Sequence, residues 1–113
     1  MSKRAIERSI NHWKRMINWA KKQDNKTEEF WNLGSLMEND LGETFNANYC
    51  TLCMEIAGDC DKCEIVKAGY DSCNDGGNNP YLDCFRATTW NEWLPPAKKM
   101  VKLLENVKKK KNP

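Results

Sequence analysis

The sequence contains only one histidine, His12, and lacks the short motifs that mark many enzymes. It has no phosphate-binding glycine loop, and no serine or cysteine motif is accompanied by a histidine partner. A deaminase-like zinc site is also excluded, because no His-x-Glu accompanies the Cys-x-x-Cys pairs. The sequence therefore predicts a protein that is not an enzyme.

Long apolar runs are also missing. No stretch is long enough to span a bilayer, and the N-terminal residues do not resemble a signal peptide. We therefore expect a cytoplasmic protein that does not interact with a membrane. No proline-, glycine- or serine-rich linker divides the 113 residues, so we expect one domain, 1–113, in which a metal crosslink would add stability.

Cysteine, in contrast, is concentrated in one stretch. All six cysteines lie between Cys50 and Cys84, and the first four form two Cys-x-x-Cys pairs. Two thiolates separated by two residues can hold one metal ion while the backbone turns beneath it, so segment 49–73 is predicted to bind Zn²⁺. An iron–sulfur cluster, disulfides and free thiols are the alternatives, but reduced cytosolic thiols and the spacing favour zinc. The predicted ligands are Cys50, Cys53, Cys60 and Cys63.

Other residues could enter this tetrad. Cys73 is an alternative fourth ligand, which would most easily replace Cys60 or Cys63 if the following loop returns over the site. We expect Cys84 to be a small buried hydrophobic residue. His12 borders the apolar stripe of the first predicted helix. We expect it to be a packed or exposed helix residue, and ligation of the metal is the alternative.

The apolar pattern predicts a small, mainly α domain of three to four helices with an irregular zinc-binding loop region. The first helix is the clearest, because apolar residues recur at three- and four-residue steps. We expect the second helix to begin at Thr27 and to end at Leu41, with Gly42 in the left-handed position that follows it, and Pro95-Pro96 to separate the last two helices. Residues 43–78 are otherwise predicted to be irregular. The expected helices cover residues 2–22, 27–41, 80–94 and 96–109.

Specific side chains are expected to form the core. On the first helix they are Ile6, Ile10, Trp13, Ile17 and Ala20, with Met16 beside them. On the third they are Tyr81, Cys84, Phe85 and Thr88, and on the last Ala97, Met100, Val101, Leu104 and Val107.

The net charge of +2 conceals an uneven distribution. Residues 1–22 carry seven basic side chains and one acid, residues 97–113 again carry seven and one, and residues 23–96 carry four and fourteen. We expect the basic terminal helices to lie against the acidic centre. The alternative is a basic face offered to nucleic acid or to an acidic protein.

Several short motifs together resemble a group of small, uncharacterised proteins encoded by phages and bacteria. The matching motifs are Ser9-Ile10-Asn11-His12-Trp13-Lys14, Cys50-Thr51-Leu52-Cys53, Cys60-Asp61-Lys62-Cys63, Gly69-Tyr70-Asp71-Ser72-Cys73 and Asn79-Pro80-Tyr81. The resemblance covers most of the chain, although Glu64 replaces the proline that follows the fourth cysteine in that group. It implies a phage setting, and hence a host cytoplasm, but no activity.

Two functions fit these observations. The first is a zinc-stapled protein-interaction module that binds a host protein, as an inhibitor or modulator of that protein or of a defence system. Five tryptophans favour it, since tryptophan is enriched in binding hot spots. The alternative is a nucleic-acid-binding protein that uses the basic faces of the first and last helices. The acidic residues around the cysteines weigh against that alternative.

Overall fold

The computed structural model describes residues 3–24, 26–45, 64–70 and 79–111. These residues form helices and connecting turns, with no β-strand among them, so the expected mainly helical class is confirmed. The helices are α1 (Lys3–Lys21), α2 (Leu33–Leu41), α4 (Glu64–Lys67), α5 (Tyr81–Arg86) and α6 (Trp90–Lys111).

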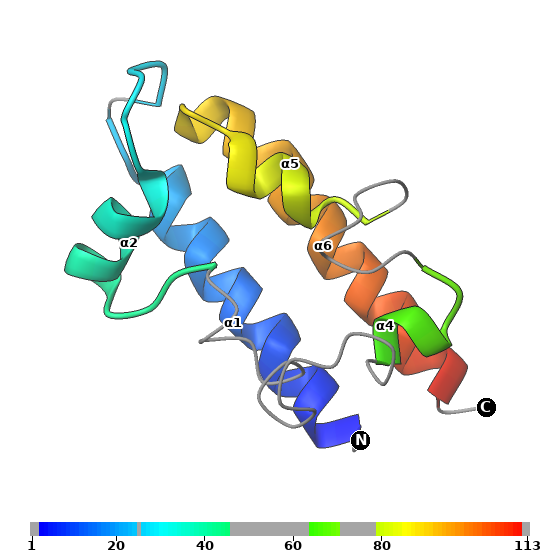
Figure 1. The fold of residues 1–113 in the computed structure, drawn as a ribbon. Coiled ribbons are helices and arrows are strands. Elements are labelled where there is room, and N and C mark those ends of the chain that lie inside the picture. The colour runs from blue at the N-terminus through cyan, green and yellow to red at the C-terminus, as the bar shows by residue number, and fades with distance from the viewer. Residues whose placement is uncertain (1–2, 25, 46–63, 71–78, 112–113) are drawn as a thin grey trace.

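The two longest helices, α1 and α6, lie side by side and run in opposite directions (Figure 1). An ion pair of 3.1 Å between Glu7 Oε1 and Lys108 Nζ joins the start of α1 to the end of α6. The two chain ends therefore lie at the same end of the helix pair, while α2 and α5 lie toward the other end (Figure 1).

The core forms where the apolar faces of α1 and α6 meet. Every residue of the stripe predicted on α1 is buried, and so is Met16. Stacked rings cross the interface, because the centroids of Trp13 on α1 and Trp93 on α6 lie 6.1 Å apart at an interplanar angle of 17°. Trp90 meets Trp93 edge to face at 5.7 Å. Such aromatic pairs add to the hydrophobic stabilisation of the core.

Tryptophan contributes mainly to packing. Trp13, Trp90 and Trp93 are buried, and Trp19 is packed against the core with its ring edge to face on Trp90. Of the five tryptophans, only Trp31 is fully exposed on the surface, at 99%. The number of tryptophans in the sequence is therefore weak evidence for a protein-binding surface, because four of the five pack in or against the core.

Helix α2 starts six residues later than predicted. Thr27 does not cap it; instead, the Asn32 side chain accepts a hydrogen bond of 3.1 Å from the Ser35 amide. The preceding turn is held by tertiary contact, because the Phe30 amide donates to the Thr88 carbonyl at 2.9 Å. The expected end is correct: Gly42 has a φ of +83°, and its amide donates to the Glu38 carbonyl.

The helix expected over 80–94 is in fact two helices, α5 and the start of α6. Thr89 caps α6, since its hydroxyl accepts a hydrogen bond of 3.1 Å from the amide of Glu92. The pattern Thr-x-x-Glu is a capping-box signature that sequence analysis overlooked. With the break here, Cys84 points into the core, whereas Phe85 is 63% exposed and Thr88 is also exposed, contrary to prediction.

The break expected at Pro95-Pro96 is wrong, because α6 continues through both prolines. Each proline removes one helical hydrogen bond and crowds the preceding turn. Packing offsets this cost, since Trp93 before the prolines and Ala97 after them are fully buried. Val101 is only half-buried, while Leu103, absent from the predicted face, is buried.

The irregular region predicted over 43–78 contains the single helical turn α4. Ile65 from this turn is buried in the core. Most of the rest of that region lies outside the described residues. None of the described helices is both long enough and apolar enough to cross a membrane.

Candidate functional site

A groove runs between α1 and α6 on the outside of the helix pair. It consists of two adjoining hollows of about 430 Å³ and about 330 Å³, which share Lys14 and Glu105. We call this feature the α1–α6 groove. The first hollow is lined by Glu7, Ile10, Asn11, Lys14, Glu105, Lys108 and Lys109. The second is lined by Lys14, Ile17, Asn18, Lys21, Lys98, Val101, Lys102 and Glu105.

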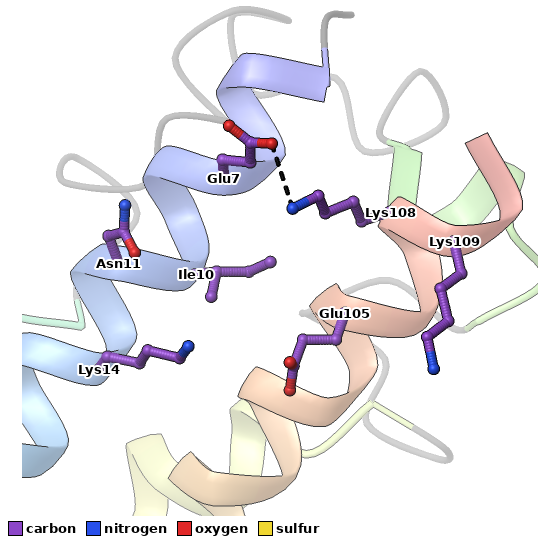
Figure 2. Close-up of a pocket in the computed structure, with 7 residues that line it drawn as sticks. All are labelled: Glu7, Ile10, Asn11, Lys14, Glu105, Lys108 and Lys109. Atoms are coloured by element: carbon purple, nitrogen blue, oxygen red, sulfur yellow. Dashed lines mark ion pairs between the residues drawn. The ribbon is translucent and has the colours of Figure 1, made fainter. Parts of the chain in front are cut away.

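The antiparallel packing of the two helices creates this groove. Ile10 and Lys14 extend from α1 toward α6, where Glu105 and Lys108 lie (Figure 2). The contributing α1 residues recur at three- or four-residue steps, which places them on one side of the helix.

Lysine dominates the polar lining of the groove. Six lysines and two glutamates contribute, a net charge of +4. Lys108 is paired with Glu7, but the other five form no ion pair with any described residue. These five are Lys14, Lys21, Lys98, Lys102 and Lys109. Like charges held close together repel one another, so an anionic ligand in the groove would be stabilised.

The floor of the groove is apolar. Ile10 in the first hollow and Ile17 in the second are mostly buried in the core but contribute to the lining, and the half-buried Val101 of α6 lines the second hollow with Ile17. Glu105 lies between the lysines as a shared element of both hollows. The groove therefore combines a lysine-rich rim, an apolar floor and one central acid.

A second polar cluster joins α1 to the loop after α2. His12 is 5% exposed, and its Nδ1 lies 2.6 Å from Glu43 Oε1. Arg15 also donates to this carboxylate from Nε, at 3.1 Å to Oε1 and 3.2 Å to Oε2, and its Nη2 forms an ion pair of 3.0 Å with Oε1. Burial raises the pKa of the Glu43 carboxyl, but hydrogen bonds and positive charge from Arg15 and His12 hold it below its ordinary value of 4.5.

The Arg15–Glu43 pair is an instance of the predicted neutralisation of a basic helix by the acidic centre. Among the described residues, no other lysine or arginine of α1 forms an ion pair with an acid of segment 23–96. It does not extend to the five groove lysines, whose side chains have no acidic partner in the described part of the chain.

The predicted metal ligands Cys50, Cys53, Cys60 and Cys63, and the alternative Cys73, lie outside the described residues. Within the described ranges, no three histidine, cysteine, aspartate or glutamate side chains gather closely enough to hold a metal ion.

Cys84 and His12 are both described. Cys84 is fully buried, as expected of a small hydrophobic core residue. His12 is a packed helix residue, and since its Nδ1 contacts Glu43, only Nε2 could serve as a metal ligand.

Ser9, His12 and Glu43 have the residue types of a hydrolytic triad, but not its geometry. The hydroxyl of Ser9 is buried and forms no hydrogen bond in the described part of the chain. The contact through which a histidine would activate a nucleophile is therefore missing there. His12 and Glu43 instead link α1 to the loop after α2.

Sequence analysis did not identify the groove lysines as one site. The exposed basic residues Arg4, Arg8, Arg15 and Lys22 mark the outer face of α1, and none of them lines the groove. The missing information was which side of α6 meets α1, because that choice decides which lysines face each other. The spacing of Lys14 and Lys21 on α1, and of Lys98 and Lys102 on α6, was the available signal.

Comparison with known proteins found no matching protein family, no similar curated protein and no similar solved structure.

Proposed function

We propose that this protein is a non-enzymatic, zinc-stapled interaction module that binds an acidic region of a host protein. The observation that carries this proposal is the α1–α6 groove, in which five lysines form no ion pair with any described residue. A net positive groove attracts acidic partners and accelerates their association. Its apolar floor offers an additional contact for nonpolar side chains.

The zinc staple is part of the same proposal and rests on the sequence. Two Cys-x-x-Cys pairs, formed by Cys50, Cys53, Cys60 and Cys63, can supply four thiolates to one Zn²⁺ ion. Such a site is closed, so its role would be to stabilise the fold rather than to activate water.

The cellular setting is proposed from the resemblance to small phage and bacterial proteins. It supports a role in the host cytoplasm as a phage-encoded inhibitor or modulator of a host protein or defence system. Binding without catalysis is sufficient for such a role.

Affinity capture from bacterial lysate tests this proposal when wild-type protein is compared with matched charge variants. Lys14→Glu reverses a charge shared by both hollows, and Lys102→Glu reverses one on the facing helix. Lys99→Glu is the control, because Lys99 lies on α6 but lines a different hollow with Tyr70 and Asp83. We expect both groove variants to lose a partner that the control retains; equal recovery by all variants would contradict the proposal.

Nucleic-acid binding is the second candidate. The observation that favours it is the exposure of Arg4, Arg8 and Arg15 on the outer face of α1, beside the lysines of the groove. Arginine and lysine are the side chains that neutralise backbone phosphates. Two features weigh against it: Arg15 is already paired with Glu43, and Glu105 is central in the groove.

A further inference from the structure

We propose that the ligand of the α1–α6 groove is an amphipathic helix of the partner, acidic along its edges and carrying a cationic residue at its centre. This inference rests on the proposed function and specifies the partner's chemistry. It follows from the length of the groove, from its apolar floor and from the position of Glu105.

The length of the lysine-rich rim fits a short helix. The α6 residues of the rim extend from Lys98 to Lys109. At a rise of about 1.5 Å per residue, this separation corresponds to roughly 16 Å, or about three helical turns. A partner helix of three to four turns therefore reaches both ends of the groove.

The floor and rim specify the pattern of that helix. Ile10, Ile17 and Val101 offer apolar surface between the two main helices. A ligand helix with one apolar stripe can contact them, which is the general mode of helix-in-groove recognition. Carboxylates flanking the stripe would then face Lys14 and Lys102, so charge complementarity selects an acidic helix.

Glu105 distinguishes a peptide from a nucleic acid. It belongs to both hollows, so an extended ligand that fills the groove passes beside its carboxylate. Duplex DNA carries about one negative charge per 1.7 Å of its axis, so a duplex that followed the groove would bring phosphates toward Glu105 as well as toward Lys14. A helical peptide can instead place a lysine at that point and carboxylates elsewhere, satisfying both signs of charge.

Two designed peptides of about four turns test the proposal by fluorescence anisotropy against the full-length protein. Both carry a leucine stripe flanked by glutamates; one has a central lysine and the other a central glutamate. A scrambled version of the first peptide and a duplex DNA of comparable length are the controls. We expect the central-lysine peptide to bind at least about tenfold more tightly than its scrambled version, since each tenfold corresponds to about 1.4 kcal/mol.

Glu105→Lys provides the sharper readout. This variant should reverse the preference between the two peptides. A lysine at this position attracts the central glutamate of one peptide and repels the central lysine of the other. Lys14→Glu should weaken both peptides about tenfold, whereas Lys99→Glu should leave both affinities unchanged. Circular dichroism and thermal unfolding of each variant establish that the fold is retained.

The possible results separate this inference from the proposed function. Equal binding of the scrambled peptide, no reversal by Glu105→Lys, or tighter binding of duplex DNA would overturn the helix proposal. If a cellular partner is nevertheless captured and then lost on Lys14→Glu, the interaction function stands while its helical ligand does not. If capture is also insensitive to Lys14→Glu, both are wrong.

Discussion

The Nδ1 atom of His12 lies 2.6 Å from the Oε1 atom of Glu43, which ties the middle of α1 to the loop that follows α2. An ionised carboxylate can only accept hydrogen bonds, so the imidazole is the donor. Arg15, one turn further along α1, donates to the same carboxylate. A single glutamate therefore holds two side chains of α1 and fixes the point at which the chain leaves α2.

The first prediction concerns the pH dependence of this cluster. The pKa of Glu43 lies below 4.5 in the folded protein, so the unfolded chain binds a proton more readily. The cluster therefore stabilises the fold above about pH 4.5 and loses that contribution as the pH falls through the folded pKa. We expect Glu43→Gln to lower the free energy of unfolding by about 1 kcal/mol at neutral pH, and by less at acidic pH.

Urea unfolding between acidic and neutral pH measures this difference. Glu29→Gln is the control, because Glu29 is an exposed acid in the loop before α2, whereas Glu43 is half-buried. A Glu43→Gln effect that stays constant across the pH range would show that the carboxylate does not act through its charge.

The second prediction tests the cap of α6. Thr89→Ala removes the hydroxyl that accepts a hydrogen bond from the Glu92 amide at 3.1 Å, and should cost about 1 kcal/mol of stability. The neighbouring Thr88 is exposed, and its hydroxyl contacts Glu92 only at 3.5 Å, so Thr88→Ala should cost much less. Equal losses in thermal unfolding would mean that the cap does not hold the start of α6.

Sequence periodicity was sufficient for α1 but not for the other helices. The α1 stripe from Ile6 to Ala20 faces the core as predicted, because a long repeat averages over local exceptions. The errors arose where tertiary contacts override local preference. The Phe30–Thr88 hydrogen bond delays α2, and burial of Trp93 and Ala97 carries α6 through two prolines.

The candidate site could be predicted only in part. The charge distribution correctly identified both terminal helices as basic, but a groove depends on the relative rotation of two helices, which no local pattern specifies. Lys14 and Glu105 illustrate the difficulty, because they are ninety-one positions apart in the sequence and line the same two hollows. The predicted cysteine tetrad remains a prediction.

The third prediction concerns the metal. Purified protein should contain about one zinc ion per chain, and chelation should unfold it at least in part, since structural zinc binding is coupled to folding. Cys50→Ser and Cys53→Ser should lose zinc or fail to fold. Cys84→Ala should retain zinc, because Cys84 is fully buried in the core. Elemental analysis and native mass spectrometry measure these contents.

The cysteine variants also test the choice of tetrad. Retention of zinc by Cys53→Ser together with its loss from Cys84→Ala would show that the ligand set is wrong. Metal-free protein with two disulfides, isolated under reducing conditions, would rule out the zinc staple itself.

The last prediction decides between the two candidate functions. If the groove accepts an acidic peptide, binding to random duplex or single-stranded nucleic acid should be weak and disappear near physiological salt. A nucleic-acid-binding protein would instead show log affinity falling linearly with log salt, with a slope that reflects several phosphate contacts.

Charge-reversal variants test the same alternative. Arg8→Glu with Arg15→Glu should then weaken binding to all nucleic-acid sequences, because both residues are exposed on the same outer face of α1. Since Arg15 also pairs with Glu43, Arg4→Glu with Arg8→Glu is the variant that leaves that pair intact. Submicromolar, salt-dependent binding lost in both double variants would replace the protein-interaction function with the nucleic-acid one.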